Sequence, residues 1–481
     1  MRLVGGYRRE WLRRDLVAGV VLTTLLVPQG MAYAELAGLP PVTGLYTTVL
    51  ALVAYAAFGP SRVFVLGPDS ALGLLIAAAV VPLIGARGDP GQAVALAGML
   101  ALLVGVLCIG AGFARLGVLA QLLSRPVRIG YLNGIAIVVL VDQLPKLFGF
   151  TTDATGTIDG IEQFVRGVID GETVVAALLL GVASLVVIYG LRAWSPAIPG
   201  ILIAAVGATV ITAVLDLAAE GVPVVGSIPS GFPTPAIPDV SLDDVGALLV
   251  AAAGLAFVTL TDSVALSRSF ASHRHETVDA DKEIIALGAA NVAAGLFQGF
   301  PVSASTSRTA LAESAGSRTQ LTGIVGAVGV LVVLVADGGL ARDLPRSVLA
   351  AIIVVAAFTL FDVGALRWMW RVRRSELLLS LVALASVVIL GALEGIVVAI
   401  ALSLANFVRR AWSPYDAVLG RITGEKGYHD LDRHPEALTI PGLVLYRFDA
   451  PLFFANAELF ARRVTNALAA RSEPTRWIVV A

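Results

Sequence analysis

Charge, cysteine and histidine are scarce in this chain of 481 residues. Only 14% of the residues are charged, against about 25% in an ordinary soluble protein. Hydrophobic residues make up 57%, and the mean hydropathy is +0.86. Long uncharged runs recur through about the first 410 residues, and several approach the roughly 20 apolar residues that span a bilayer as a helix. These features exclude a cytosolic enzyme with one packed core and indicate a polytopic membrane protein.

The single cysteine, Cys108, lies inside an apolar run. One thiol excludes a disulfide framework and a multi-thiolate metal site. The formal net charge of −1 gives no basic excess for a nucleic-acid partner. We therefore expect neither a cofactor nor a nucleic acid, and basic residues matter only by their position.

Hydropathy predicts about fourteen membrane spans. Ten are clear, at roughly 17–36, 42–58, 93–113, 172–190, 197–215, 245–266, 319–336, 347–361, 377–391 and 395–408. Two weaker spans lie at roughly 126–141 and 283–298. Two more, at roughly 61–82 and 300–316, begin as short extended pieces before turning helical. The predicted fold class is an all-α polytopic membrane protein.

The N-terminus allows two interpretations. Arginines precede an apolar stretch, and Ala32-Tyr33-Ala34 could be a cleavage site, as in a signal peptide. However, Pro28 and Gln29 interrupt the stretch and further spans follow at once. A first membrane helix is the simpler interpretation.

Lysine and arginine collect in alternate loops. The loop 217–244 carries four acids and no Lys or Arg. Basic residues gather instead in the N-terminal arm and in segments such as 115–128 and 367–374. By the positive-inside rule, both termini are predicted to be cytoplasmic.

The chain divides into four predicted parts: an arm at 1–14, a transmembrane domain at 15–411, a linker at 412–429 and a soluble segment at 430–481. The soluble segment alternates apolar and polar residues at 442–448 and continues with an amphipathic helix near 456–470. These elements are too few to bury a core. We interpret 430–481 as the N-terminal part of a small α/β domain, apparently truncated.

The two segments that begin extended are 235 positions apart (303 minus 68), close to half of the membrane part. This spacing predicts two repeats of seven spans. An odd number of spans inverts the second repeat, and a binding site is then expected at the interface of the repeats near the midplane. Non-helical backbone is tolerated there only where protein or a water-filled cavity satisfies it.

Both broken segments offer a helix N-terminus to an anion. Pro68 suits the opening turn of a helix, followed by Asp69 and Ser70. In the second segment Ser305, Thr306 and Ser307 are cap-forming hydroxyls. Two such N-termini contribute about +1, and Arg308 raises this to about +2. The alternative is that the hydroxyls only cap a helix while Arg308 extends to an interface.

Three acids are predicted at the same depth, Glu35, Asp69 and Asp262. Each must pair with a cation, bind one or hold a proton. These possibilities correspond to structural pairing, sodium coupling and proton coupling. Asp69 has a further interpretation as a carboxylate that stabilises the helix dipole. Glu35 and Asp262 are 227 positions apart (262 minus 35), which suggests equivalent places in the two repeats.

Four stretches carry a resemblance to a known family. They are Val27 to Ala34, Ala37 to Tyr46, Ile285 to Phe300 and Ser307 to Leu321. In order and spacing they resemble the sulfate permease (SulP) family of anion transporters. The resemblance implies fourteen spans in two inverted repeats, as in uracil permeases. It also implies a homodimer and a cytoplasmic STAS domain, of which 430–481 would be the start.

The resemblance further implies a core domain, spans 1–4 and 8–11, that moves against a gate domain, spans 5–7 and 12–14. The family's anion-site positions correspond to Gln29, Tyr33, Pro68, Asp69, Ser307 and Arg308. Asp262 matches a position linked to coupling ions in some prokaryotic members. Asp69 departs from the family, in which this position is apolar or a hydroxyl.

We expect a secondary active transporter of small anions in a bacterial inner membrane, working by alternating access. Proton-coupled uptake of a dicarboxylate such as fumarate, or of sulfate, is the preferred expectation, since three ionised acids would repel an anion. One alternative is sodium-coupled symport of bicarbonate or another anion, with Asp262 and Thr261 as ligands. Another is an exchanger or channel. An intramembrane enzyme is disfavoured, because no nucleophile with a base occurs at membrane depth.

Overall fold

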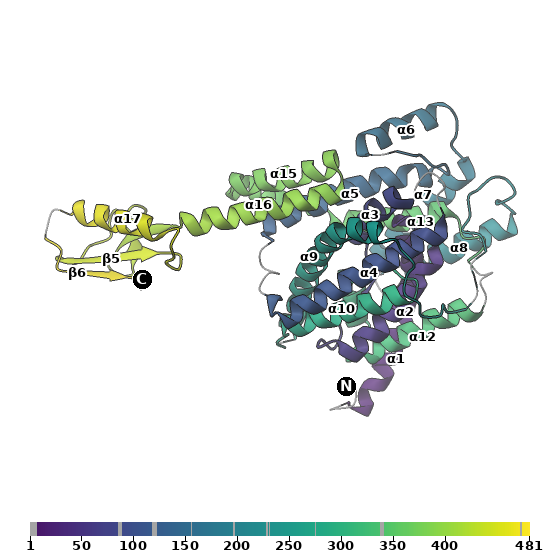
Figure 1. Ribbon diagram of the computed structural model, residues 1–481, viewed down its shortest axis with the longest axis horizontal. Coiled ribbons are helices and arrows are strands. Elements are labelled where there is room, and N and C mark those ends of the chain that lie inside the picture. The colour runs from purple at the N-terminus through teal and green to yellow at the C-terminus, as the bar shows by residue number, and fades with distance from the viewer. Residues whose placement is uncertain are drawn as a thin grey trace. The chain divides into compact units, whose positions relative to one another are not determined.

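The computed structural model describes residues 7–84, 89–117, 123–154, 156–195, 198–227, 229, 231–274, 276–336, 341–471 and 474–481. The chain forms two compact units, Met1–Ile400 and Ala401–Ala481 (Figure 1). The first unit is almost entirely helical, and the second contains a small sheet.

The first half of the membrane part runs α1 (Arg9–Leu36), α2 (Pro41–Phe58), β1 (Leu66–Gly67), α3 (Ser70–Ile84), α4 (Pro90–Phe113), α5 (Arg125–Leu147), α6 (Thr157–Ile169), α7 (Val175–Trp194) and α8 (Gly200–Val214). The second half runs α9 (Leu242–His273), α10 (Ala280–Leu296), β2 (Ser303–Ala304), α11 (Thr306–Ser314), α12 (Leu321–Ala336), α13 (Arg346–Leu360), α14 (Val363–Val372), α15 (Arg374–Leu390) and α16 (Ala392–Trp412). In the described part of the chain, eight helices are long and apolar enough to cross a membrane, and three shorter apolar helices accompany them. The predicted fold class is confirmed.

Two helices were missed by the sequence analysis. α6 and α14 follow the fifth span of each half. Charged residues such as Asp159, Glu162 and Arg371 alternate in them with apolar ones. A window of about 19 residues averages such a short amphipathic helix away. Their equivalent positions themselves indicate two repeats.

Helix packing shows the repeat directly. α4 packs against α9 and α10, and in the other half α12 packs against α1 and α2. Likewise α5 of the first half packs against α15 of the second, and α13 of the second half packs against α7 of the first. The short helices follow the same rule, since α3 packs against α9 and α11 packs against α1. Each pair recurs with the two halves exchanged. This is the arrangement expected of two repeats related by a two-fold axis.

Glycines allow the closest helix crossings. A Cβ on Gly288 of α10 would lie 2.7 Å from the carbonyl oxygen of Gly105 on α4. A Cβ on Gly44 of α2 would lie 1.8 Å from the carbonyl oxygen of Gly30 on α1. Small residues let membrane helices approach until their backbones touch. These contacts fix α10 on α4 and α2 on α1, and so place the segments that lead into β1 and β2.

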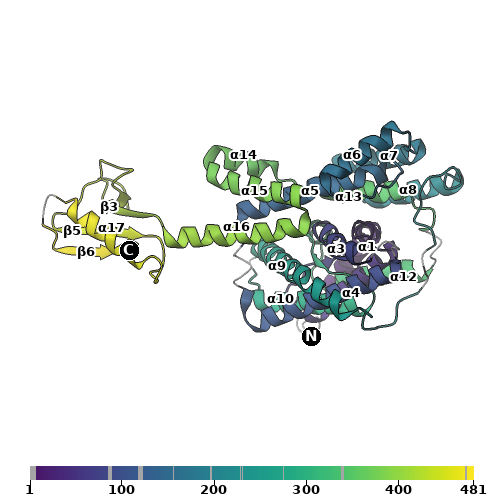
Figure 2. The same ribbon diagram turned by 45° about the horizontal axis from the view of Figure 1, so that its top comes forward.

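The helices of the first unit lie in two groups (Figure 2). One group contains α1, α3, α4, α9, α10 and α12, and the other contains α5, α6, α7, α8, α13, α14 and α15. Contacts of α1 with α8 and α13, and of α3 with α5 and α13, join the groups. Below, the first group is called the inner group and the second the outer group.

The second unit is an α/β fold with strand order β4-β3-β5-β6. Its elements are β3 (Asp416–Gly420), β4 (His429–Asp430), β5 (Leu443–Phe448), α17 (Ala457–Ala469) and β6 (Trp477–Val480). β5 and β6 are parallel, and α17 connects them by packing Phe460 and Val464 on Val444, Tyr446 and Phe448. β3 lies within the segment predicted to be a linker, because its partner β5 comes only later in the chain.

Candidate functional site

The two broken spans meet in a two-residue antiparallel sheet. Leu66 of β1 faces Ala304 of β2, and Gly67 faces Ser303. α3 starts at Ser70, directly after β1, and α11 starts at Thr306, directly after β2. The pairing satisfies backbone groups that lipid could not. As the sequence predicts, two helix N-termini therefore lie beside one another.

Polar side chains hold the segments that enter this sheet. Asn291 of α10 accepts a hydrogen bond from the Val302 N–H at 2.9 Å. The Thr47 hydroxyl of α2 accepts one from the Phe300 N–H at 3.2 Å. Before β1, the Thr309 hydroxyl accepts one from the Val65 N–H at 3.1 Å. These bonds place both extended segments without further secondary structure.

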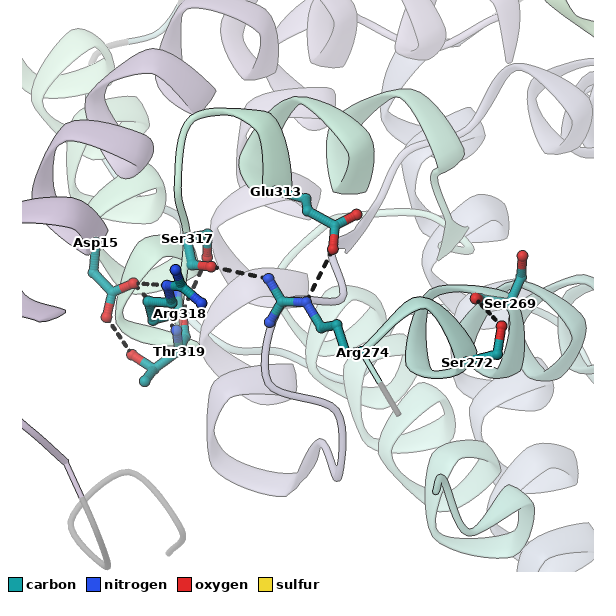
Figure 3. Close-up of polar contacts among 8 residues, drawn as sticks. All are labelled: Asp15, Ser269, Ser272, Arg274, Glu313, Ser317, Arg318 and Thr319. Atoms are coloured by element: carbon teal, nitrogen blue, oxygen red, sulfur yellow. Dashed lines mark hydrogen bonds and ion pairs between the residues drawn. The ribbon is translucent and has the colours of Figure 1, made fainter. Parts of the chain in front are cut away.

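The far end of α11 is anchored by charged and polar groups (Figure 3). Arg274, at the end of α9, pairs with Glu313 at 2.9 Å and donates to the Ser317 carbonyl oxygen at 3.1 Å. Asp15 of α1, fully buried, accepts hydrogen bonds from the Arg318 N–H at 2.6 Å and the Thr319 N–H at 3.1 Å. α11 is thus fixed between α1, α9 and α12.

Arg308 is the largest fully buried side chain of the described residues, with 0% exposure. Its Nη2 donates a hydrogen bond to the Pro68 carbonyl oxygen. Its Nε and Nη1 have no hydrogen-bond partner. A Cβ at Gly67, which has φ +156°, would lie 2.7 Å from Nη1, so only glycine leaves room there. Buried donors without partners are costly, and such a guanidinium indicates a binding site for an anion.

Three predicted site residues surround the guanidinium. The buried Tyr33 hydroxyl of α1 interacts with Ser70, and it lies within electrostatic range of Asp69 and Arg308. Asp69 interacts electrostatically with Arg308. Its Oδ1 also accepts a hydrogen bond from the Ala71 N–H at 3.0 Å. Asp69 therefore caps α3 and faces the cation at the same time.

The hydroxyls of the second broken span divide into two kinds. Ser305 is buried and accepts a hydrogen bond from the Arg308 N–H at 3.4 Å as the cap of α11. Thr306 and Ser307 are exposed, and Ser307 lines a cavity of about 210 Å³ together with Thr24 and Arg192. The start of α11 therefore borders this cavity.

Gln29 of α1 is buried, and its Oε1 has no hydrogen-bond partner. It lies four residues before Tyr33, on the same face of the helix. α1 packs against both α3 and α11. Gln29 is therefore a second buried side chain with an unused polar atom on the helix that faces both N-termini.

The three acids predicted at the same depth have different partners. Asp262 on α9 pairs with Arg128 on α5 at 3.6 Å, within electrostatic range of Asp69. Glu35 lies at the end of α1, 4.0 Å from Arg346 at the start of α13. Both acids thus have cationic partners on the outer group, and these partners offset their negative charges. Asp69 is the acid that shares the cradle with Arg308.

The Thr261 hydroxyl donates to the Phe257 carbonyl oxygen at 2.7 Å, within its own helix. Among the described residues, no group of three or more His, Cys, Asp or Glu side chains could hold a metal ion. A sodium site at Asp262 and Thr261 would need carbonyl oxygens to supply most of its ligands.

Sequence reasoning missed two cations. Arg128 was counted as a cytoplasmic loop residue, although it lies inside the predicted span 126–141. An arginine in an apolar span is by default functional, and this signal could have identified it. Arg346 follows a proline just before a span, and nothing local distinguishes it from an ordinary flanking arginine.

Comparisons with known proteins identify relatives of the chain. A family model described as the sulfate permease family matches residues 12–383. The probable sulfate transporter Rv1739c of Mycobacterium tuberculosis is 44% identical over 474 residues, covering 98% of this chain and 84% of that protein. Human solute carrier family 26 member 6 is 33% identical, covering 94% of this chain and 62% of that protein.

Solved structures show the same fold. The structure of SLC26A9 matches with a TM-score of 0.87 at 22% identity, covering 100% of this chain and 80% of that chain. The transmembrane domain of the cyanobacterial bicarbonate transporter BicA matches with a TM-score of 0.71 at 24% identity, covering 82% and 98%. The family resemblance and the predicted all-α membrane fold are confirmed.

Proposed function

Because the chain belongs to the sulfate permease family and is a membrane transporter of anions, we propose that it carries sulfate inward by proton-coupled alternating access. The observation that carries the proposal is Arg308, buried between two helix N-termini with two N–H groups unused. A tetrahedral or planar dianion offers several acceptor oxygens to such a cradle. We define the anion cradle as Arg308, Tyr33, Asp69 and the starts of α3 and α11.

The relatives favour sulfate over fumarate as the substrate. The sequence alone favoured a dicarboxylate, because a site near +2 suits a dianion. Sulfate is a dianion too, so the same charge argument supports it. The cavity beside Ser307 is about 210 Å³, and it admits either anion.

A proton on Asp69 would match the charge of the cradle to its ligand. Two helix N-termini and Arg308 sum to about +2. An ionised Asp69 lowers the total to about +1, and protonation restores about +2 for a dianion. The proton would then travel with the anion. Sodium at Asp262 is the alternative coupling ion, and the electrostatic contact between Asp262 and Asp69 would let either site influence the other.

Two ion pairs support alternating access between the inner and outer groups. Asp262–Arg128 joins α9 to α5, and Glu35–Arg346 joins α1 to α13. In each, the first helix of one repeat contacts the fifth span of the other. Because the repeats are inverted, the pairs belong to opposite sides of the membrane. We assign them to the two gates, with the inner group as the moving core.

The membrane is proposed to be the inner membrane of a bacterium, with both termini cytoplasmic and a homodimer as the functional unit. Arginine supports the orientation, since the segments at 115–128 and 367–374 are basic. Thiol labelling of single cysteines in the arm and in 217–244, on intact spheroplasts, tests the orientation. Chemical crosslinking in the membrane tests the dimer.

The test of function is uptake of labelled sulfate, fumarate or bicarbonate into proteoliposomes, with an inward proton gradient, a sodium gradient or neither. We expect sulfate uptake driven by protons and abolished in Arg308→Ala. If several anions were taken up at rates that depend on neither the proton nor the sodium gradient, coupled symport would be overturned in favour of exchange or a channel. Normal uptake by Arg308→Ala would overturn the anion cradle.

A further inference from the structure

Glu283 on α10 is a buried carboxyl that the anion cradle does not use. Its side chain is 1% exposed. Oε1 accepts a hydrogen bond from the Tyr55 hydroxyl at 2.5 Å, and Oε2 accepts one from the Ser61 hydroxyl at 2.9 Å. In the described part of the chain these two neutral groups are its interaction partners, and no cation is among them.

The surroundings of Glu283 explain why no cation reaches it. α10 packs against α2, α4 and α9, and α2 and α4 contain no Asp, Glu, Lys, Arg or His. On α9, Arg268 is exposed and Arg274 is engaged by Glu313. On its own helix, Lys282 pairs with the capping Asp279 at 2.9 Å. Arg62, next to Ser61, is exposed.

Burying an ionised carboxylate that has only neutral donors is energetically costly. Binding a proton removes that cost. Within the membrane part, Glu283 therefore differs from Asp262 and Glu35, whose charges are offset by arginines. Its surroundings are those of a site that can take up and release a proton.

Residues 61–68 connect Glu283 to the cradle, and we call them the strap. Glu283 holds its first residue, and the Gln320 amide donates to the carbonyl oxygens of Ser61 and Phe64, at 2.9 Å each. Further along, β1 pairs with β2. The strap ends at Pro68, whose carbonyl oxygen accepts from Arg308. A continuous chain of backbone thus runs from the buried acid to the guanidinium.

In the other repeat, neutral groups hold the corresponding extended segment. Asn291 and Thr47 hold the segment before β2. Holding an extended segment therefore does not require an acid. The acid before β1 adds a titratable proton that Asn291 and Thr47 cannot supply.

We infer that Glu283 binds a proton, and that this proton changes how the strap positions Pro68 against Arg308 in the anion cradle. The ionised carboxylate accepts from both hydroxyls. A protonated carboxyl donates its own hydrogen, so one hydroxyl must turn from donor to acceptor. When that hydroxyl is Ser61, the strap shifts and Pro68 shifts with it. Protonation also removes a negative charge, so we expect sulfate to bind more tightly at lower pH.

Proton binding is tested without transport, by infrared difference spectroscopy of the purified full chain in lipid during a pH titration. The wild type should show a protonated carboxyl band that Glu283→Gln lacks. Glu313→Gln is the matched control, because Glu313 is paired with Arg274 and should keep the band. An unchanged titration in Glu283→Gln would overturn the inference. If that variant does not fold, Tyr55→Phe and Ser61→Ala keep the acid and should shift the band.

The effect on the cradle is tested by equilibrium binding of labelled sulfate in an Asp69→Asn background, which removes the other proposed proton. The inference rests on the proposed function only here. With Glu283 present, we expect sulfate affinity to rise as the pH falls, by about tenfold for each unit by which sulfate shifts the pKa of the carboxyl. Affinity should be independent of pH in Glu283→Gln, and its pH dependence should be reduced in Ser61→Ala, which keeps the charge of the acid but loses its bond to the strap. An equal pH dependence in all three would overturn the link. If sulfate does not bind at all, the proposed substrate fails and the infrared titration alone decides about Glu283.

Discussion

Arg308 carries the proposed anion site because it is buried, charged and only partly hydrogen-bonded. An ion pair with Asp69 alone would leave its Nε and Nη1 unused. An anion that accepts from both would complete the guanidinium. The cost of burying this side chain is then offset mainly when the substrate is present.

Replacing Arg308 by alanine should lower sulfate affinity strongly. Two hydrogen bonds to a charged group contribute roughly 3 kcal/mol, which corresponds to about a hundredfold weaker binding. Arg308→Lys should recover only part of it, since lysine lacks the planar fork. Equilibrium binding of labelled sulfate measures both. Wild-type affinity in Arg308→Ala, with folding intact, would place the anion elsewhere.

Gly67→Ala should weaken sulfate binding through Arg308. The new Cβ would lie 2.7 Å from Nη1 at φ +156°, and we expect a cost of about 1–3 kcal/mol. Gly156→Ala is the matched control, because a Cβ there meets nothing within 4 Å. Binding and thermal unfolding of both variants provide the check, and equal behaviour would contradict the proposed crowding.

At this scale the sequence predicted much of the candidate site. Pro68, Ser305 and Arg308 stood out, because helix-start residues and an arginine interrupt apolar runs. The partners of Glu35 and Asp262 could not be predicted, because Arg346 and Arg128 come from the opposite repeat and are brought close only by tertiary packing.

Among the elements, α1 and α9 each carry an acid to a helix of the outer group. The side chains of Glu35 and Arg346 are 13% and 49% exposed, so solvent screens the pair. Its contribution to folding is then below about 1 kcal/mol. A role in the transport cycle is a better reason for the pair than stability.

Reversing one charge should therefore impair transport more than folding. We expect Arg346→Glu to reduce sulfate uptake in proteoliposomes with little change in Tm. The double exchange of Glu35→Arg with Arg346→Glu should restore part of the uptake, since it rebuilds the pair with opposite polarity. Two variants that lose uptake independently, with no recovery in the double, would rule out a gate formed by this pair.

The α4–α10 crossing should tolerate no added bulk. Gly288→Val would place side-chain atoms where Gly105 and Ile109 of α4 now lie. Overpacking costs about 1–3 kcal/mol, so we expect a lower Tm in thermal unfolding followed by circular dichroism. Gly110→Ala on the same helix pair meets nothing within 4 Å and should leave Tm unchanged. Equal Tm values would show that the helices can separate.

The elements were predictable where hydropathy is uniform. The long spans such as α2 and α4 fall close to the predicted ranges, because nothing interrupts their apolar runs. α6 and α14 were missed, because charged residues spaced along a short helix cancel the apolar signal. Which helices form the inner and outer groups depends on packing between repeats, and hydropathy contains no information on that.

For the whole molecule, the central question is how a proton gradient drives transport of the anion. In the proposed cycle Asp69 carries a proton beside Arg308. We expect Asp69→Asn to exchange sulfate across the membrane but to lose accumulation driven by a proton gradient, since its side chain cannot titrate. Counterflow and gradient-driven uptake, measured on the same proteoliposomes, separate the two activities. Undiminished proton-driven accumulation in this variant would move the coupling proton to another acid.

The overall repeat was predictable from one spacing, because two interruptions half a membrane domain apart require two copies of the same unit. The pairing of β1 with β2 was not predicted. It depends on inversion that brings position 66 to position 304, and short extended pieces alone do not identify a partner.

That two-residue sheet has a consequence for biosynthesis. β1 leaves the ribosome 237 residues before β2 (303 minus 66), which is about 10–50 s of synthesis at roughly 5–20 residues per second. Through that time the backbone of Leu66 and Gly67 lacks the strand that will satisfy it, in a solvent that cannot. The first broken span must therefore wait outside the lipid, held by the insertion machinery or in an aqueous pocket of the nascent bundle. Membrane insertion of the first broken span is then completed only after β2, in the second half of the chain, has been synthesised.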